Sequence, residues 1–141
     1  MAAARKILVP VDGSACSLRA LELAVDRLAE AQNASLIVIN VQPGLPASRF
    51  VTRSMIAEHQ HRMSEDALKP ARAFLKSRKV KAEVVAKVGD PAAVIVALAE
   101  RKGCSEIVMG NSGRGRVSGL LLGSVASKVI QLAPCPVTVV K

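Results

Sequence analysis

The chain has 141 residues and a formal net charge of +9 at pH 7; half of its residues are hydrophobic, but only two, both phenylalanine, are aromatic. This length fits one domain with a core of aliphatic side chains, and the composition excludes a disordered chain. No apolar run approaches the roughly 20 residues of a membrane span, and the three cysteines are too scattered for a disulfide framework or a zinc site, so we expect a cytoplasmic protein.

The first half of the chain predicts two strands, each followed by a helix. Residues 6–10 form a short β-branched run, and the turn residues 12–14 supply a cap for a helix whose apolar side chains recur every three or four residues to about Asn33. Residues 36–41 are nearly all apolar, as expected for a parallel strand covered on both faces. A long helix follows at about 52–77, and Pro70 inside it should kink the helix or split it in two.

The second half predicts three more strands. Residues 81–88 alternate more strongly and indicate a strand near the sheet edge. Asp90 and Pro91 are typical of a helix cap and first helical position, and this helix should end near Gly103. Residues 106–109 form a fourth strand, a last helix stops before Pro134, and residues 136–140 form a fifth strand. This alternation predicts an α/β fold, a doubly wound parallel sheet with helices on both faces.

A glycine-rich segment follows the fourth predicted strand. Residues 110–119 hold four of the nine glycines, and glycine permits positive φ and lets backbone amides approach a ligand. Gly123 and Ser124 open the last helix, whose free N–H groups and positive dipole end can seat a phosphate. No Asp or Glu occurs after residue 106, whereas Arg114 and Arg116 add positive charge. Each feature alone could merely turn the chain or cap a helix, but together they predict an anion site.

The standard phosphate motifs narrow the class of site. The pattern G-x-x-x-x-G-K-[ST] is absent, which excludes a P-loop ATPase. Gly113 and Gly115, followed by Ser118, come near the dinucleotide fingerprint, but the acidic ribose ligand expected about 20 residues later is missing. An NAD enzyme is therefore disfavoured.

Two motifs of the chain occur together. Gly110 is followed after two residues by Gly113 and after nine more by Gly123-Ser124, and Asp12-Gly13-Ser14 follows the first strand. In both motifs the chain resembles the ATP-binding branch of the universal stress protein family. The resemblance covers essentially the whole chain, up to the closing Pro-Cys-Pro-Val-Thr-Val-Val strand. Asn111-Ser112 stands where a Ser-His pair is often found, which removes one possible side-chain contact. The resemblance implies one nucleotide-binding domain over residues 1–141, with an open five-stranded parallel sheet in the order 3-2-1-4-5.

The resemblance also implies an adenine-nucleotide site in the crevice between the first and fourth strands. ATP would bind there, with Mg²⁺ held mainly by its phosphates. Val41 can offer main-chain groups to the adenine edge, and Asp12 can offer a carboxylate to a ribose hydroxyl, the adenine amino group or a hydrated Mg²⁺. The residues that match the family's binding positions are Pro10, Asp12 and Val41 around the adenosine, and Gly110, Asn111, Ser112, Gly113, Arg114, Gly115, Arg116, Gly123, Ser124, Val125 and Ala126 around the ribose and phosphates. Replacing Gly113 by Ala together with Gly123 by Val should abolish binding, because both changes add carbon atoms where phosphates would lie.

By this resemblance the chain is a stress-response protein that acts as a nucleotide-dependent binding or signalling module with an unknown protein partner, and as a homodimer through the edge strand Val137–Val140. Three alternatives stay open. A slow ATPase or phosphotransferase would depend on Asp12, since the phosphate loop contains no carboxylate or histidine. A dimeric scaffold with an empty pocket would not need the intact glycines. Nucleic-acid binding through the basic cluster between Lys69 and Lys87 is disfavoured, because no aromatic stacking platform accompanies it.

Overall fold

Strands and helices alternate along the chain in the computed structural model, which describes residues 4–113 and 122–141. In chain order the described elements are β1 (Arg5–Pro10), α1 (Ala15–Glu30), β2 (Ala34–Gln42), α2 (Arg53–Ser77), β3 (Glu83–Val88), α3 (Pro91–Lys102), β4 (Glu106–Gly110), α4 (Ser124–Leu132) and β5 (Val137–Val140). Part of the glycine-rich segment, including Arg114, Gly115 and Arg116, lies outside the described residues.

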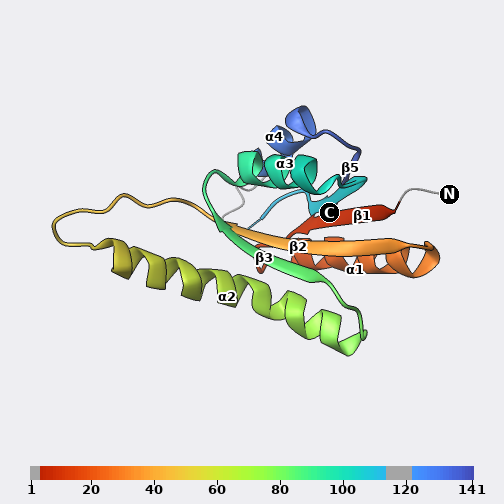
Figure 1. Cartoon of the computed structure of the whole chain (residues 1–141), viewed down its shortest axis with the longest axis horizontal. Helices are drawn as coiled ribbons and strands as arrows, with labels where there is room; N and C mark the ends of the chain where they lie inside the picture. The colour runs from red at the N-terminus through yellow and green to blue at the C-terminus, as the bar shows by residue number, and fades with distance from the viewer. Residues whose placement is uncertain (1–3, 114–121) are drawn as a thin grey trace.

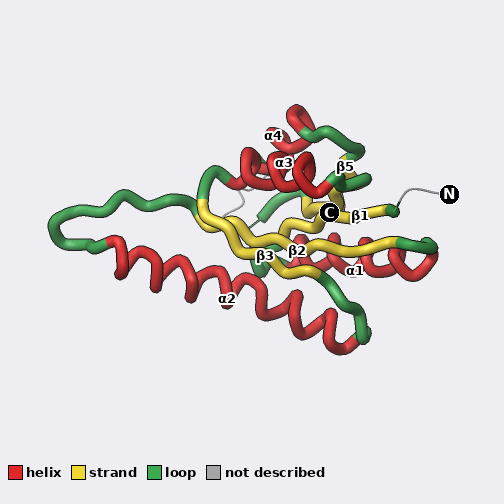
Figure 2. The backbone as a smooth tube through the Cα atoms, in the orientation of Figure 1, coloured by secondary structure: helices red, strands yellow, loops and turns green. Residues whose placement is uncertain are grey.

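The strands form one five-stranded sheet in the order β3-β2-β1-β4-β5 (Figures 1 and 2). All neighbouring strands are parallel. The predicted order and the predicted edge positions of the third and fifth strands are therefore confirmed. Because β1 lies between β2 and β4 and is parallel to both, the carboxyl ends of these three strands lie at the same end of the sheet. Pro10, the last residue of β1, pairs there with Ile39 of β2.

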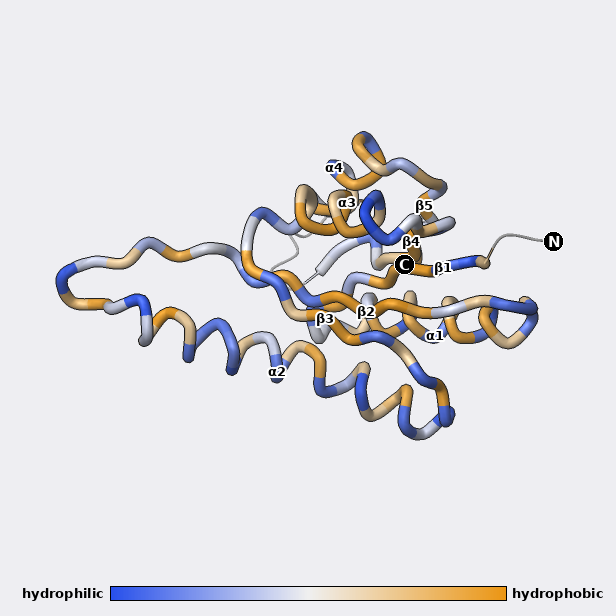
Figure 3. Tube along the Cα trace, viewed as in Figure 1, coloured by the Kyte–Doolittle hydropathy of each residue, from blue (hydrophilic) through white to orange (hydrophobic). Residues whose placement is uncertain are grey.

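A layer of helices covers each face of the sheet (Figure 1). On one face, α1 and α2 pack on apolar side chains that include Val9, Val38 and Val108. On the other face, α3 and α4 pack on a second cluster that includes Ile39 and Ile107. The trace of β2 is largely orange, that is hydrophobic, in Figure 3, as a central parallel strand covered on both faces requires. The loop from β2 and the start of α2 project beyond these layers (Figure 1).

The helix starts follow from local capping chemistry. The side chains of Ser14, Thr52 and Asp90 accept hydrogen bonds from backbone N–H groups in the first turns of α1, α2 and α3. Gly103 ends α3 with a φ of +65°, a conformation that favours glycine. Pro70 does not split α2, which is one helix from Arg53 to Ser77. Neighbouring α2 side chains buried in the core hold the segments on both sides of the proline against the same sheet face.

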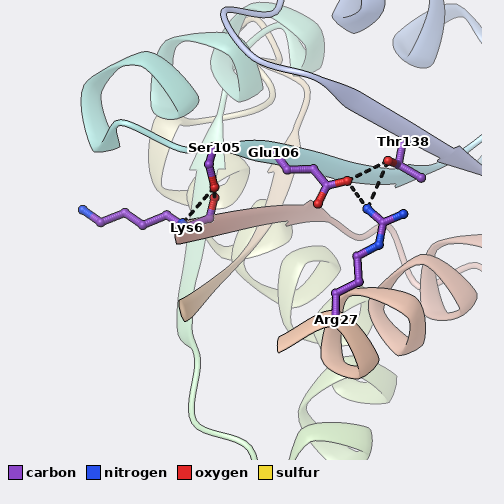
Figure 4. Close-up of polar contacts among 5 residues, drawn as sticks. All are labelled: Lys6, Arg27, Ser105, Glu106 and Thr138. Carbon is purple, nitrogen blue, oxygen red and sulfur yellow. Dashed lines mark hydrogen bonds and ion pairs between the residues drawn. The ribbon is translucent and has the colours of Figure 1, made fainter. Parts of the chain in front are cut away.

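A polar cluster joins α1, β4 and β5 at the opposite end of β4 from the predicted site (Figure 4). Glu106 is 8% exposed, and its Oε2 accepts hydrogen bonds from Arg27 Nη1 and, at 2.7 Å, from Thr138 Oγ1. Nearby, Ser105 Oγ accepts from the Lys6 N–H and donates to the Lys6 carbonyl, both at 3.1 Å. These contacts anchor the amino ends of the central strands. Among the residues in the described ranges, no helix is both long and apolar enough to cross a membrane.

Candidate functional site

A cleft of about 540 Å³ opens at the carboxyl ends of β1, β2 and β4. The chain leaves β1 toward α1 on one face of the sheet, whereas the helix after β4, α4, lies on the other face. This divergence creates the crevice that open α/β sheets use for ligands, and the volume is typical of a small-molecule site. The predicted residues that line the cleft are Pro10, Asp12, Val41, Gly110, Ser112, Gly113, Gly123, Ser124, Val125 and Ala126.

Asp12 forms one wall of the cleft. Its Oδ1 accepts a hydrogen bond of 2.9 Å from the Ser14 N–H, which orients the carboxylate across the turn before α1. The loop after β4 lies directly against this carboxylate, since a Cβ atom added to Gly113 would overlap Asp12 Oδ2 and lie 3.3 Å from Cγ. The sequence-distant Asp12 and Gly113 are thus neighbours across the site.

The glycines of the site are required for close approach and not for positive φ. Within the described residues, the glycines with positive φ are Gly13, Gly89 and Gly103, so Gly110, Gly113 and Gly123 do not use the positive φ that glycine permits. A Cβ on Gly110 would lie 2.8 Å from Cys16 Sγ. A Cβ on Gly123 would lie 3.2 Å from the Asn111 carbonyl oxygen. Each added carbon would therefore meet the protein itself, whatever ligand is present.

Asn111 is not among the residues that line the cleft; its hydrogen bonds hold the loop after β4 in place. Its N–H donates to the Val140 carbonyl at 2.7 Å, and its own carbonyl accepts from the Gly123 N–H. Its side-chain Oδ1 accepts from Cys16 Sγ at 3.1 Å and from Ser112 Oγ at 3.3 Å. Asn111 therefore links the end of β5 to the start of α4.

The start of α4 points its first turn at the cleft. Its N-cap residue, Gly123, makes no side-chain capping hydrogen bond, and no acidic residue occupies the first turn. Ser124, Val125 and Ala126 begin the helix and line the cleft, so their backbone N–H groups and the positive end of the helix dipole lie at the site. Such a helix start favours an anion.

The sequence alone did not predict several of the residues that line the cleft. Asn40 and Gln42 of β2 line the cleft, as do Met63 and Ala67 of α2 and Ile95 of α3. Asn40 interrupts the apolar run of residues 36–41 and is only 2% exposed, so a polar residue in a buried run was the sequence signal for it. The contributions of α2 and α3 depend on how these helices pack across the sheet, which no local pattern encodes.

The basic cluster on α2 has acidic neighbours. Lys69 and Arg72 share a shallow surface with Glu65 and Asp66, and Arg72 lies 3.6 Å from the Glu65 carboxylate. Within the described part of the chain, no group of three or more His, Cys, Asp or Glu side chains could hold a metal ion. The cleft lining described above contains one carboxylate, that of Asp12.

Two thiols, of the buried Cys104 and the half-buried Cys135, lie apart from the cleft lining, in the cluster under α3 and α4. Burial raises the pKa of the Cys104 thiol above its ordinary value, and the neighbouring Cys135 adds to that increase. Burial likewise raises the pKa of Cys135. Both groups therefore favour the neutral thiol.

The sheet order, the two helix layers and a cleft at the switch point define an open, doubly wound α/β protein with a ligand site at the carboxyl edge of its strands. Residues 3–141 match the Universal stress protein family. The chain is 38% identical over 141 residues to Universal stress protein MJ0531 of Methanocaldococcus jannaschii, covering 97% of this chain and 82% of that protein. The chain belongs to the universal stress protein family.

Solved structures share this fold. That of hypothetical protein MJ0577, from a study on structure-based assignment of its biochemical function, superposes with a TM-score of 0.80 at 29% identity, covering 97% of this chain and 95% of that one. A universal stress protein crystallised in complex with cAMP superposes with a TM-score of 0.73 at 29% identity, covering 99% of both chains.

Proposed function

We propose that residues 1–141 form one domain that binds an adenine nucleotide, ATP foremost, in the cleft at the carboxyl ends of β1, β2 and β4. The observation that carries this proposal is the pairing of the α4 helix start, without a side-chain cap, with the Asp12 carboxylate in one cleft of about 540 Å³. The complex of a relative with cAMP supports an adenine nucleotide as the ligand.

The two parts of the cleft suit the two parts of a nucleotide. Apolar side chains, among them Ile39, Val41 and Met109, offer a surface on which a purine can pack. The backbone amides at the start of α4, together with Gly110 and Gly113, suit the phosphates. We propose that four more residues of the same glycine-rich segment help to hold the ribose and phosphates: Asn111, Arg114, Gly115 and Arg116.

Asp12 would bind a ribose hydroxyl or a water ligand of Mg²⁺. Since Mg²⁺ requires six oxygen ligands and the described cleft lining offers one carboxylate, the phosphates and water would supply the others. The same scarcity argues against fast catalysis, because Asp12 is the one carboxylate in the described cleft lining that could act as a general base toward water. The site therefore fits a nucleotide-dependent binding module better than an ATPase with rapid turnover.

We further propose that nucleotide occupancy controls contacts with a protein partner in the cytoplasm and that the chain is a homodimer. β5 pairs with β4 on one side only, so its other edge can accept a second copy of Val137–Val140. Asn111 and Val140, joined by a hydrogen bond of 2.7 Å, connect this edge directly to the proposed phosphate loop.

A charge placed in the phosphate seat tests the proposal. Ser124 is the exposed first residue of α4, and Ser124→Glu would put a carboxylate at the positive helix end. This change favours the helix by about 0.3–1 kcal/mol but repels phosphate. We expect calorimetry to show a loss of Mg·ATP affinity of at least about tenfold with no loss of thermal stability.

The matched control is Ser54→Glu, in the first turn of α2 and outside the cleft lining. It makes the same change of charge at a comparable helix position, so it should leave ATP affinity unchanged. Equal ATP affinity in Ser124→Glu and the unmodified protein would refute the proposed position of the phosphates.

A further inference from the structure

The arm between β2 and α2, defined as residues 43–55, gathers exposed apolar side chains. It projects beyond the two helix layers (Figure 1), and the first buried residue of α2 is Ile56. Of the eight large hydrophobic side chains that are exposed in the described ranges, four belong to the arm: Leu45, Phe50, Val51 and Met55. Phe50 is 80% exposed, more than any other of the eight. This clustering marks the arm as an interaction surface.

The backbone at the tip of the arm satisfies its own hydrogen bonds. The Ser48 N–H donates to the Val51 carbonyl at 2.9 Å, and the Val51 N–H donates to the Ser48 carbonyl at 3.3 Å. The Phe50 N–H donates to Ser48 Oγ at 3.2 Å. Thr52 then caps α2, because its Oγ1 accepts from the Met55 N–H at 3.1 Å. Since these backbone groups need no water as a partner, the tip can enter a less polar medium at low cost.

Positive charge borders these apolar side chains. Arg49 and Arg53 are both exposed, and no Asp or Glu occurs between Glu30 and Glu58. Within residues 4–113 and 122–141, no carboxylate forms an ion pair with either arginine. The guanidinium carbon of Arg49 lies 5.5 Å from the centroid of the Phe50 ring, and the positive end of the α2 dipole adds to the same field. The arm therefore presents apolar and cationic groups together and attracts a negatively charged surface.

From this combination we infer that the arm binds the anionic surface of a lipid membrane. Phe50 and its apolar neighbours enter the headgroup region, while Arg49 and Arg53 contact lipid phosphates. A flat surface suits the arm because the exposed side chains lie on a projecting tip, which reaches such a surface before the helix layers do (Figure 1). A protein partner would need an acid-lined socket of matching shape for the same tip. The inference does not depend on nucleotide binding.

Phe50→Trp tests the inference by fluorescence, because the chain otherwise contains no tryptophan or tyrosine. Vesicles of phosphatidylcholine mixed with phosphatidylserine should shift the emission to shorter wavelength, and vesicles of phosphatidylcholine alone should shift it much less. Leu132→Trp is the matched control, because Leu132 is 57% exposed at the end of α4 and lies outside the arm. Its emission should stay unchanged with either vesicle. An unshifted emission in Phe50→Trp, or an equal shift in both variants, would overturn the inference.

Sedimentation with the same vesicles separates the apolar contribution from the charged one. Phe50→Ser should weaken binding to the mixed vesicles about fivefold or more, and Arg53→Gln should weaken it about fivefold. Arg72→Gln is the matched control for charge and should change the binding little, because Arg72 lies outside the arm and 3.6 Å from the Glu65 carboxylate. Equal losses in Arg53→Gln and Arg72→Gln would mean that net charge alone attracts the vesicles, contrary to the inference.

Two further outcomes identify other occupants of the arm. No binding to either vesicle would overturn the membrane surface in favour of a protein partner. A change of molecular mass in vesicle-free Phe50→Ser, measured by sedimentation velocity, would assign the arm to a contact between copies of the chain. Because Phe50 is 80% exposed, the urea midpoint of Phe50→Ser should equal that of the unmodified protein, which separates lost binding from unfolding. Calorimetry with Mg·ATP tests the proposed nucleotide site independently of all these results.

Discussion

Gly113→Ala probes the contact between the loop after β4 and Asp12. The added Cβ would overlap Asp12 Oδ2 and lie 3.3 Å from its Cγ, so the carboxylate must rotate or the loop must move. Rotation would break the bond of 2.9 Å between Asp12 Oδ1 and the Ser14 N–H, at a cost of about 0.5–1.5 kcal/mol in folding free energy. If Asp12 holds the ribose or the hydrated metal, losing that charged hydrogen bond costs a further 1.5–3 kcal/mol, roughly, in binding free energy.

The loss of binding free energy predicts that Mg·ATP affinity falls about 10- to 150-fold in Gly113→Ala, through the displaced carboxylate. A double-mutant cycle with Asp12→Ala, followed by calorimetry and urea unfolding, isolates this route. Once the carboxylate is absent, Gly113→Ala should have little further effect on affinity. Fully additive losses in the double variant would refute the reasoning and would mean that the new carbon acts on the phosphates directly.

Three further changes test the packing, the thiols and the sheet edge. Gly110→Ala should destabilise the fold by about 1–3 kcal/mol in urea unfolding, because its Cβ would lie 2.8 Å from Cys16 Sγ, and Cys16→Ala should recover part of that loss; no recovery would contradict the contact. Since burial raises the pKa of Cys104 above its ordinary 9.0, the neutral thiol stabilises the fold below that pH and the benefit disappears as pH rises through the raised value. Cys104→Ala should therefore flatten the fall of the urea midpoint above about pH 9, and an identical slope in both proteins would exclude this source. Val139→Pro should convert a dimer to a monomer in sedimentation, because proline cannot donate to a strand pair across the β5 edge; a surviving dimer would use another surface.

Local chemistry explains why much of the fold could be predicted. Asp90, Pro91 and Gly103 mark the ends of α3 because caps and left-handed turns depend on a few adjacent residues. The nearly continuous apolar run of β2 indicated a parallel strand, since a strand covered by helices on both faces buries the side chains of both its faces. The strand order came from the family resemblance and agrees with the structure.

The unpredicted features depend on contacts between distant segments. Pro70 indicated a kink or a split in two, and the split does not occur, because core packing keeps α2 as one helix. The sequence indicated that the glycines let a ligand approach the backbone, whereas Gly110 allows Cys16 of α1 to approach the end of β4. Met63 reaches the cleft only because α2 crosses the sheet at that point. The sequence motifs located the glycines and Asp12, but the structure was needed to show that Gly113 and Asp12 meet.

Backbone amide shifts test the central claim most directly. In a titration of isotopically labelled protein with Mg·ATP, the amides of Ser124, Val125 and Ala126 should show the largest changes, because they form the proposed phosphate seat at the start of α4. The amide of Ser105, at the opposite end of β4, should stay unchanged. Saturating nucleotide that leaves the three helix-start amides unaltered, or that shifts only residues outside the cleft, would contradict the account.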